Sequence, residues 1–411
     1  MPKQYPRWQS RNVTAALQTR RVVVIAGARQ TGKTTLSRQI SQPDSVYRTL
    51  DDTGLLAAAQ ADPQGFVKNP SGTMIIDEIQ KVPLLLPEIK RAVDLGNRPG
   101  QYLLTGSANL QTLPGVSESL AGRVKNIRLR PLTVGEIGGG APDFLSRAFA
   151  ADFPVKITGY DKETVIDLAF RGGYPEAVRL KDRRDRREWH RDYADSLLAR
   201  DLRDIANIRR QDVLRELTVA LTAWSGKFLD LKSVCAPLAI SKLTVESYLN
   251  ALLSLYLFDK VAPWTRSDYE RIGRRAKFFT ADTGLMSSLL GWEAREVLLN
   301  ADRSGKLVET LVFQELAAQI DLDSRHGLFQ YRDREKREID FIVEREDGVL
   351  LGVEVKAGQH VATDDFKHLH WFAEHLAGKK SFTGMVLYTG EDTLSFGKKM
   401  LAVPVAALWH P

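Results

Sequence analysis

The sequence has a single cysteine, Cys235, in 411 residues. One cysteine excludes an intrachain disulfide and a zinc site built from several cysteines. No run of about 18 uninterrupted apolar residues occurs, so we expect no membrane-spanning helix and no membrane partner. Low-complexity tracts are absent, and the first residues, MPKQYPRWQS, lack the apolar core of a signal peptide. These absences favour a globular, cytoplasmic protein.

The composition of the chain is that of a globular protein, with 43% hydrophobic and 27% charged residues. A chain of 411 residues is expected to form two to four domains. The net charge is +7 and the pI is about 9.3. A basic excess of this size makes a polyanionic partner more plausible than it would be for an acidic chain.

Five short β-rich runs alternate with helical patterns in the first third of the chain. This alternation predicts an α/β domain with a parallel sheet flanked by helices. The runs are RVVVIAG (21–27), SVYRTLD (45–51), GTMIIDE (72–78), QYLLTGS (101–107) and NIRLRPL (126–132). EIGGGAP (136–142) is rich in glycine and predicts the first domain boundary. Residues 143–220 are expected to be mostly helical.

GARQTGKT matches the phosphate-binding pattern G-x-x-x-x-G-K-[ST], and it lies between an apolar run and the helical run TTLSRQI. Glycines let backbone N–H groups approach phosphates, and the helix N-terminus favours their negative charge. Lys33 would reach the β- and γ-phosphates, and Thr34 would bind Mg²⁺. We expect ATP to contact Gly27, Ala28, Arg29, Gln30, Thr31, Gly32, Lys33, Thr34 and Thr35.

TMIIDE predicts the second half of this site, because Asp77 follows an apolar strand at the sheet edge where parallel-sheet ligands bind. Asp77 would hold the magnesium ion through water, and Glu78 would orient or deprotonate the attacking water. The run LLTGSANL ends in polar residues, of which Ser107 and Asn109 are candidates to position that water. Loop capping is an equally good explanation for either of these side chains.

Residues 229–290 predict a helix, a tight turn, a second helix and two short strands. A helix–turn–helix followed by a hairpin is the plan of a winged helix, a common nucleic-acid module. Its hairpin region, 266–277, is basic and could contact phosphates. The cations are Arg266, Arg271, Arg274, Arg275 and Lys277, against Asp268 and Glu270. A protein contact or a spacer is the alternative for this module.

EIDFIVEREDGVLLGVEVK (338–356) contains the acidic pattern of a metal-dependent nuclease. Strand alternation would place Ile339, Phe341 and Val343 on one face and Asp340 on the other. In the next strand Glu354 and Lys356 would share a face, away from the apolar Leu351, Val353 and Val355.

Asp340 and Glu354 could then hold Mg²⁺, with Lys356 positioning the water. Glu309 lies on the apolar stripe of a helix predicted over 305–319, which is costly unless a metal or lysine satisfies it, so it is a third candidate ligand. Glu315 is expected to face solvent.

The chain resembles prokaryotic AAA+-type ATPases with a C-terminal restriction-endonuclease-like domain. The resemblance rests on GARQTGKTTL, IIDEIQ, LLTGSANL, SLAGRV, LRPLTVGE and RGGYPE, in that order along the chain. It implies an ATPase core (1–142), a helical lid (143–220), a winged helix (221–298) and an endonuclease-like domain (299–411). It also implies Arg123 as an arginine finger offered to a neighbouring subunit, hence a homo-oligomer or ring, and Arg171 as a lid sensor.

The leading hypothesis is an ATP-hydrolysing machine that binds or remodels DNA and cuts it if the C-terminal site is active. A second hypothesis is an ATP-gated switch or scaffold for a protein partner, with an inert nuclease-like domain. A small-molecule phosphotransferase is a third. The acid pair Asp77–Glu78 and the additional domains argue against it.

Overall fold

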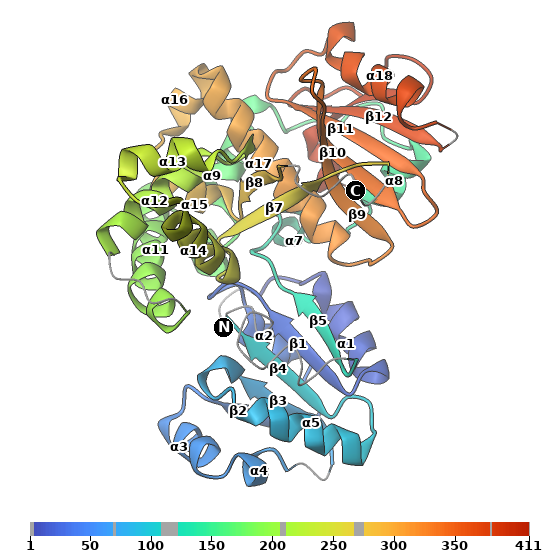
Figure 1. The fold of residues 1–411 in the computed structure, drawn as a ribbon. Coiled ribbons are helices and arrows are strands. Elements are labelled where there is room, and N and C mark those ends of the chain that lie inside the picture. The colour runs from blue at the N-terminus through green and yellow to red at the C-terminus, as the bar shows by residue number, and fades with distance from the viewer. Residues whose placement is uncertain are drawn as a thin grey trace. The chain divides into compact units, whose positions relative to one another are not determined.

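The computed structural model describes residues 4–68, 71–107, 122–205, 211–266, 275–378 and 380–410. Within these ranges no helix is both long and apolar enough to cross a membrane. The chain forms two compact units (Figure 1). The first comprises Met1–Pro131 with Ser254–Tyr256, and the second comprises Leu132–Leu253 with Leu257–Pro411.

The first unit is built on a five-stranded sheet in the order β2-β3-β4-β1-β5. All neighbouring strands in it are parallel. The strands are β1 (Val22–Ala26), β2 (Val46–Thr49), β3 (Met74–Asp77), β4 (Tyr102–Gly106) and β5 (Val124–Arg128). Each of the five β-rich runs forms one strand, so the predicted parallel α/β sheet is confirmed.

Helices cover both faces of this sheet, and every residue of the interior strand β1 is accordingly buried. Val23 and Ile25 pack with α1 and α2, whereas Val22 and Val24 pack with the cluster that includes α3, α4 and α5. Full burial of such a side chain stabilises the fold by roughly 1.5–3 kcal/mol. The helices are α1 (Gln9–Thr19), α2 (Lys33–Gln39), α3 (Thr53–Ala61), α4 (Pro63–Phe66), the 3₁₀ turn η1 (Ile79–Lys81) and α5 (Leu85–Gly96).

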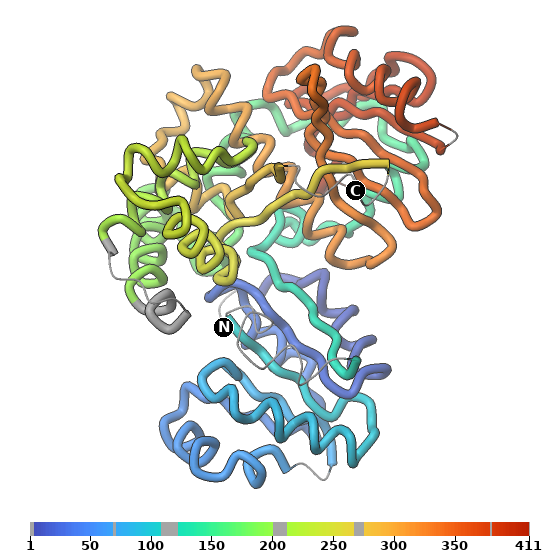
Figure 2. Tube along the Cα trace, in the orientation of Figure 1, coloured from blue at the N-terminus to red at the C-terminus, as the bar shows by residue number. Residues whose placement is uncertain are grey.

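The second unit contains a nine-stranded sheet in the order β13-β14-β12-β11-β10-β9-β7-β8-β6. Its strands are β6 (Lys227–Phe228), β7 (Phe258–Pro263), β8 (Lys277–Thr280), β9 (His326–Arg332), β10 (Glu338–Arg345), β11 (Leu350–Lys356), β12 (Phe382–Tyr388), β13 (Leu394–Ser395) and β14 (Met400–Pro404). Because β7 pairs in parallel with β9, the strands before residue 300 and those after it belong to one sheet. Figure 2 follows the course of the chain through these segments.

Helices dominate residues 143–220, as predicted. The helices of this unit are α7 (Val134–Gly138), α8 (Phe144–Ala150), α9 (Lys162–Arg171), α10 (Pro175–Arg179), α11 (Arg183–Ile205), α12 (Gln211–Ala223), α13 (Leu231–Leu238), α14 (Lys242–Ser254), α15 (Thr283–Leu289), α16 (Ala294–Leu299), α17 (Ala301–Ile320), the 3₁₀ turn η4 (Thr363–Phe366), α18 (Lys367–His375) and the 3₁₀ turn η5 (Val405–Leu408). The expected helix, turn, helix and antiparallel pair are α13, α14, β7 and β8, with β6 pairing to the other edge of β8. The assignment of this module as a winged helix remains a prediction.

The predicted alternation of side chains in β10 is wrong at Ile339, because the strand contains a β-bulge. The register between β10 and β9 shifts between Ile339 and Ile342, so one extra residue is accommodated there. As a result Ile339 packs in the cluster of Ile342 and α18, while Phe341 and Val343 pack in the cluster of α17. Ile339 therefore does not share a face with Phe341 and Val343.

Helix α17 connects segments that are far apart in the sequence. It begins after Asn300, whose side chain accepts the N–H of Arg303 and caps the helix. Gln314 accepts the N–H of Thr283 and donates to Ala281 O, while Gln319 accepts the N–H of Leu145. These bonds hold the start of the second unit and the region around α15 against one helix.

Glu315 of α17 does not face solvent, contrary to the sequence prediction. Its side chain is buried, and it accepts the N–H of Val134 at 2.6 Å. The prediction failed because α17 is buried on several sides. An acidic residue that lies off the main apolar stripe, such as Glu315, is therefore also buried. Burial raises the pKa of Glu315 to about 8, although the N–H groups of Val134 and Gly135 oppose this rise.

Candidate functional site

The phosphate-binding loop joins the end of β1 to the start of α2. Gly32, directly before α2, has a φ of 96°, a conformation that glycine adopts readily. A Cβ atom at Gly27 would lie 2.2 Å from Leu129 O, so only glycine fits where the loop passes the end of β5. Arg7 braces the loop by donating to Thr31 O and to Arg130 O, each at 2.6 Å. The loop is therefore held on both sides by its own unit.

Lys33 occupies the inside of this loop. Only 4% of it is exposed, and its ammonium donates to Gly27 O at 3.0 Å and to Ala28 O at 2.8 Å. The hydroxyl of Thr31 also donates to Ala28 O, at 2.9 Å. By contrast Arg29, Gln30 and Thr35 are exposed. The loop thus presents a buried cation ringed by backbone groups, which suits a polyphosphate.

Asp77 lies at the C-terminal end of β3, beside the loop. It is 2% exposed, and it accepts hydrogen bonds from Thr34 at 2.9 Å, from Tyr47 at 2.8 Å and from Thr105. Burial, together with the hydrogen bond to Asp77 and its charge, raises the pKa of the Tyr47 hydroxyl to about 12. A hydroxyl and a carboxylate held together at a phosphate loop fit the oxygen ligands that Mg²⁺ prefers.

Glu78 follows with an unusual backbone, since its φ is 60° although it is not a glycine. Its N–H donates to Thr105 Oγ1 at 3.2 Å, and its carboxylate accepts a hydrogen bond from Gln80. The same Gln80 amide donates to Ser107 Oγ at 2.9 Å. Gln80 therefore links the candidate base to the polar end of β4.

Gln80 and Tyr47 contact the candidate site, and the sequence patterns did not reveal them. For Gln80, the sequence offered one indication, which is its position two residues after Glu78 in IIDEIQ. Ser107 is linked to Glu78 through Gln80, and its role in positioning the water remains a prediction. Asn109 is outside the described residues.

Arg123 lies just before β5. Because β5 and β1 run parallel from Val124 and Val22, Arg123 is at the N-terminal ends of the strands, whereas the phosphate loop follows the C-terminal end of β1. Its guanidinium forms an ion pair with Asp94, donating to Asp94 Oδ2 at 3.0 Å. From this end of the sheet, Arg123 cannot reach the phosphate loop of its own subunit. A finger role in a neighbouring subunit remains a prediction.

Arg171, the predicted lid sensor, ends α9 in the second unit. Burial raises the pKa of the Glu315 carboxyl, and the charge of Arg171 is among the groups that oppose this rise. The adjacent motif RGGYPE has a packing role: the N–H of Gly173 donates to Asp282 at 2.6 Å, and a Cβ there would lie 2.0 Å from Leu132 O. A sensor role for Arg171 remains a prediction.

A second polar cluster lies where β8, β10 and α17 meet. We call it the Lys277 cluster: the Lys277 ammonium lies 2.6 Å from Glu309, 2.9 Å from Glu338 and 2.7 Å from Asp340. Lys277 is 1% exposed, so it is not the phosphate-facing wing residue that the basic hairpin pattern predicted. Burial opposes its charge, but the carboxylates of Asp340, Glu309 and Glu338 raise its pKa well above the usual value.

The remaining residues of the nuclease-like pattern lie next to this cluster. Burial and then the charge of Asp340 raise the pKa of Glu354 well above its ordinary value. One Glu354 oxygen lies 4.0 Å from His368, and Lys356 pairs with Asp365 at 3.1 Å. Among the described residues, no three His, Cys, Asp or Glu side chains are grouped so that they could hold a metal ion. Two of the residues that were predicted to bind Mg²⁺, Glu309 and Asp340, thus pair with a lysine instead.

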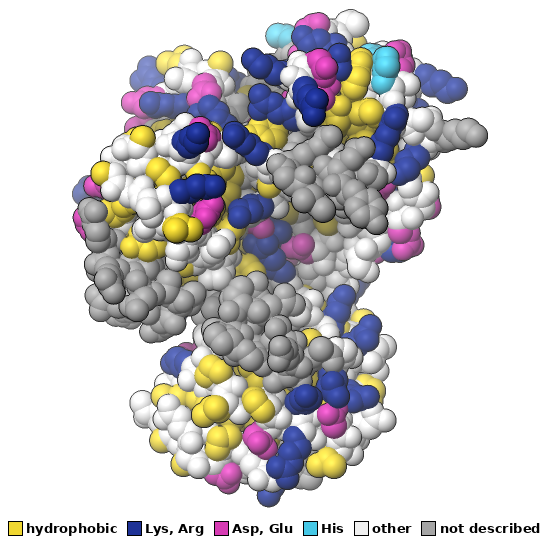
Figure 3. All heavy atoms as spheres, viewed as in Figure 1, with side chains coloured by type: hydrophobic (Ala, Val, Ile, Leu, Met, Phe, Trp, Pro, Cys, Tyr) yellow, Lys and Arg dark blue, Asp and Glu magenta, His cyan; other side chains and the backbone are white. Residues whose placement is uncertain are grey.

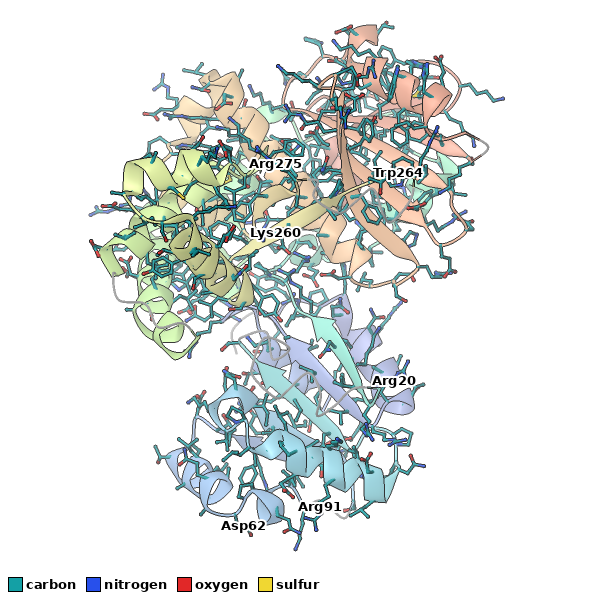
Figure 4. All side chains as sticks on the ribbon, viewed as in Figure 1. Arg20, Asp62, Arg91, Lys260, Trp264 and Arg275 are labelled. Carbon is teal, nitrogen blue, oxygen red and sulfur yellow. The ribbon has the colours of Figure 1, made fainter. Side chains whose placement is uncertain are left out.

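A groove of about 740 Å³ opens beside the cluster in the second unit. Its exposed cations are Arg266, Arg275, Arg332 and Arg334, and its acids are Asp333 and Glu335. Trp264 and Tyr331 line it, and the Arg332 guanidinium stacks 4.7 Å from the centre of the Phe228 ring. Figure 4 labels Trp264 and Arg275 beside β7, and Lys and Arg side chains are frequent on this face of the unit (Figure 3).

Comparison with known proteins places the chain in a family. It is 30% identical over 343 residues to "Uncharacterized protein Rv2008c" of Mycobacterium tuberculosis, covering 83% of this chain and 71% of that protein. The chain belongs to the Rv2008c family. "Uncharacterized protein MJ1544" of Methanocaldococcus jannaschii is also similar, at 24% identity over 361 residues, with 84% and 77% covered.

Three domain models match this Rv2008c family member. Residues 19–138 match an AAA domain, residues 162–296 a domain of unknown function (DUF8612), and residues 304–408 another (DUF4143). The AAA match supports nucleotide binding and hydrolysis by the first unit. A solved structure, the Walker-type ATPase PABY2304 of Pyrococcus abyssi, is similar at 15% identity and a TM-score of 0.41, with 68% of this chain and 94% of that one covered.

Proposed function

We propose that this protein is a Mg²⁺-dependent ATPase that couples ATP hydrolysis to the binding or remodelling of DNA. The observation that carries the ATPase part is the joined arrangement of Lys33, Thr34 and Asp77 with the Glu78–Gln80–Ser107 chain at one end of the sheet. The AAA match over residues 19–138 supports it independently.

The chemistry follows from the side chains present. The loop N–H groups and Lys33 bind the phosphates, and Thr34 and Asp77 would hold Mg²⁺, which neutralises phosphate charge when bound. Glu78 accepts a proton from water, whose oxygen forms a bond to the γ-phosphorus while the bond to the β–γ bridging oxygen breaks. Gln80 fixes the direction of the Glu78 carboxylate, and ADP and phosphate leave.

Two substitutions test the ATPase assignment. Lys33→Ala should abolish ATP binding, since it removes the buried cation of the loop. Glu78→Gln should retain ATP binding but lower kcat by roughly 10²–10⁴-fold, the usual contribution of a general base. Fluorescent ATP titration and phosphate release measure the two effects. Lys125→Ala, an exposed lysine on β5, and Glu88→Gln on α5 are the matched controls. Equal ATP binding by the Lys33→Ala variant and the wild type would contradict the assignment.

The basic groove supports the DNA part of the proposal. Four arginines outnumber two acids around it, and one of those acids, Asp333, is already paired with Arg337 at 2.8 Å. Arginine guanidinium groups suit phosphate because their donors are spread over a planar fork. The arginines would neutralise the phosphates of DNA lying along the groove. The element order α13, α14, β7, β8 agrees with a winged-helix module, and β7 contributes Pro263 to the groove.

The salt dependence of DNA affinity tests this part. Replacing Arg275 and Arg334 with alanine should weaken DNA binding and reduce the slope of log K against log [salt] by about one for each phosphate that is no longer neutralised. Arg295→Ala with Lys398→Ala removes the same charge from exposed positions outside the groove. Fluorescence anisotropy with duplex, single-stranded and branched DNA measures both variants. ATP hydrolysis at one rate with and without all three DNAs would favour the alternative of an ATP-gated switch.

A further inference from the structure

The Lys277 cluster joins three carboxylates from two elements to one ammonium from a third. Lys277 belongs to β8, Glu309 to α17, and Glu338 and Asp340 to β10. Each carboxylate lies within 2.6–2.9 Å of the Lys277 nitrogen. A lysine ammonium has three N–H donors and no acceptor, so its capacity matches these three acids.

The ammonium stands where a divalent cation would have to bind. Mg²⁺ binds oxygen ligands at about 2.0–2.1 Å and needs them on several sides. A metal held by Glu309 and Asp340 would therefore lie within a bond length or two of the lysine nitrogen, where two cations repel strongly. The two occupants exclude each other.

Lys277 cannot swing away easily because its strand is fixed on both sides. β8 is the middle strand of three, with Lys277 opposite Val261 of β7 and opposite Phe228 of β6. The Phe228 ring centre lies 6.0 Å from the ammonium. Removing the side chain from this buried position would leave the carboxylates without a cation, which is strongly unfavourable in a protein interior.

The other parts of the nuclease-like pattern are engaged as well. Asp340 uses its second oxygen to accept the N–H of Val355 at 2.9 Å, so both of its oxygens have partners. Lys356 pairs with Asp365 rather than with an acid of the cluster. Glu309, Asp340 and Lys356, three members of the pattern that predicts a metal site, are thus each paired with another protein group.

We propose that Lys277 is the permanent cation of this cluster, that it excludes a divalent metal, and that the C-terminal region accordingly does not cleave DNA by metal-dependent hydrolysis. The acids of the pattern then serve to anchor β8 to β10 and α17. Metal exclusion does not depend on the proposed function. The statement about DNA does, and it implies that DNA in the adjacent groove is bound and not cut.

A manganese titration of the full-length, nucleotide-free protein tests the proposal. Wild type and Glu354→Gln should bind the same number of Mn²⁺ ions in isothermal titration and in electron paramagnetic resonance. Lys277→Met should gain one Mn²⁺ per chain, and that ion should be lost again on adding Asp340→Asn. Lys260→Met on the neighbouring strand β7, labelled in Figure 4, removes a lysine outside the cluster and should gain none.

Two outcomes would overturn the proposal. One is a Mn²⁺ ion bound by wild type and absent from Glu354→Gln, which needs no substitution of Lys277 and so does not depend on whether that variant folds. The other is nicking of plasmid DNA by wild type in Mn²⁺ that disappears in Asp340→Asn. Failure of DNA to bind at all would count against the proposed function, and the titration would still decide metal exclusion.

Discussion

Glu78 shows how one residue can be held in a costly conformation at a candidate site. A left-handed backbone at a residue other than glycine costs on the order of 1–3 kcal/mol and persists only where the surroundings enforce it. Here Thr105 accepts the Glu78 N–H, and Gln80 donates to its carboxylate. The strained turn aims Glu78 along the direction that Gln80 and Ser107 define.

Gln80 should therefore matter for turnover and not for nucleotide affinity. In Gln80→Leu the Glu78 carboxylate and Ser107 lose their common donor, so we expect kcat to fall by roughly 10–100-fold, a modest misplacement effect. The KM for ATP should stay within about twofold, because the phosphate loop is untouched. Steady-state phosphate release gives both constants, with exposed Gln39→Leu as control. A parallel loss of ATP affinity would show that Gln80 supports the loop instead.

Glu315 gives the second unit a stability that depends on pH. Its pKa is about 8 in the folded protein against an ordinary value of 4.5, so the folded state binds the proton more tightly. This contribution is complete below the ordinary pKa and is lost as pH rises from 4.5 through about 8.

Glu315→Gln should remove part of this pH dependence. The amide oxygen can still accept the Val134 N–H, but the side chain no longer loses a proton. Calorimetry should show the variant unfolding at a higher temperature than wild type at about pH 9 and at a similar temperature near pH 5. At pH 9 the folded wild type must either keep a proton on Glu315 or bury its charge, and both cost free energy that the amide does not. Gln314 and Gln319 show that amides are already tolerated on this helix. A variant less stable than wild type at both pH values would mean that the charge itself is needed.

At the scale of elements, the sequence predicts features that have a local residue pattern. It does not predict features that depend on contacts between distant segments. Strand runs and the phosphate loop have local signatures, so β1 to β5, Lys33 and Asp77 could be located without a structure. The bulge in β10 has no such signature, and it moved Ile339 to the other cluster. Lys277 looked like one more cation of a basic hairpin, because nothing local shows that three acids lie around it.

The shared sheet makes a prediction about fragments. A fragment beginning at residue 299 would keep β9 to β14 but lose β6, β7 and β8, and with them Lys277. It would expose the edge of β9 and leave Glu309, Glu338 and Asp340 unpaired. We expect it to be insoluble or partly unfolded, whereas a fragment beginning at residue 132 should fold. Expression and circular dichroism compare the two, and a stable, cooperative fold for the shorter one would contradict the prediction.

At the scale of the whole molecule, the predicted finger role of Arg123 would make each ATP site depend on a neighbouring subunit. A finger acting in trans must first leave its ion pair with Asp94. In that case Arg123→Ala and Lys33→Ala should each be inactive alone, since one lacks the finger and the other the ATP. A mixture should recover ATPase activity, because Lys33→Ala subunits offer Arg123 to neighbours that bind ATP. No recovery at any mixing ratio, with Arg123→Ala as active as wild type, would leave Arg123 as a surface ion pair.

The Lys277 cluster also bears on how such proteins can evolve. Lys277 lies within the segment matched by DUF8612, whereas Glu309, Glu338 and Asp340 lie within the one matched by DUF4143. A recombination event that joined one segment to a foreign partner would inherit either three acids without their lysine or a lysine without its acids. The two segments are consequently expected to be transmitted as one block, with the boundary between them closed to domain shuffling.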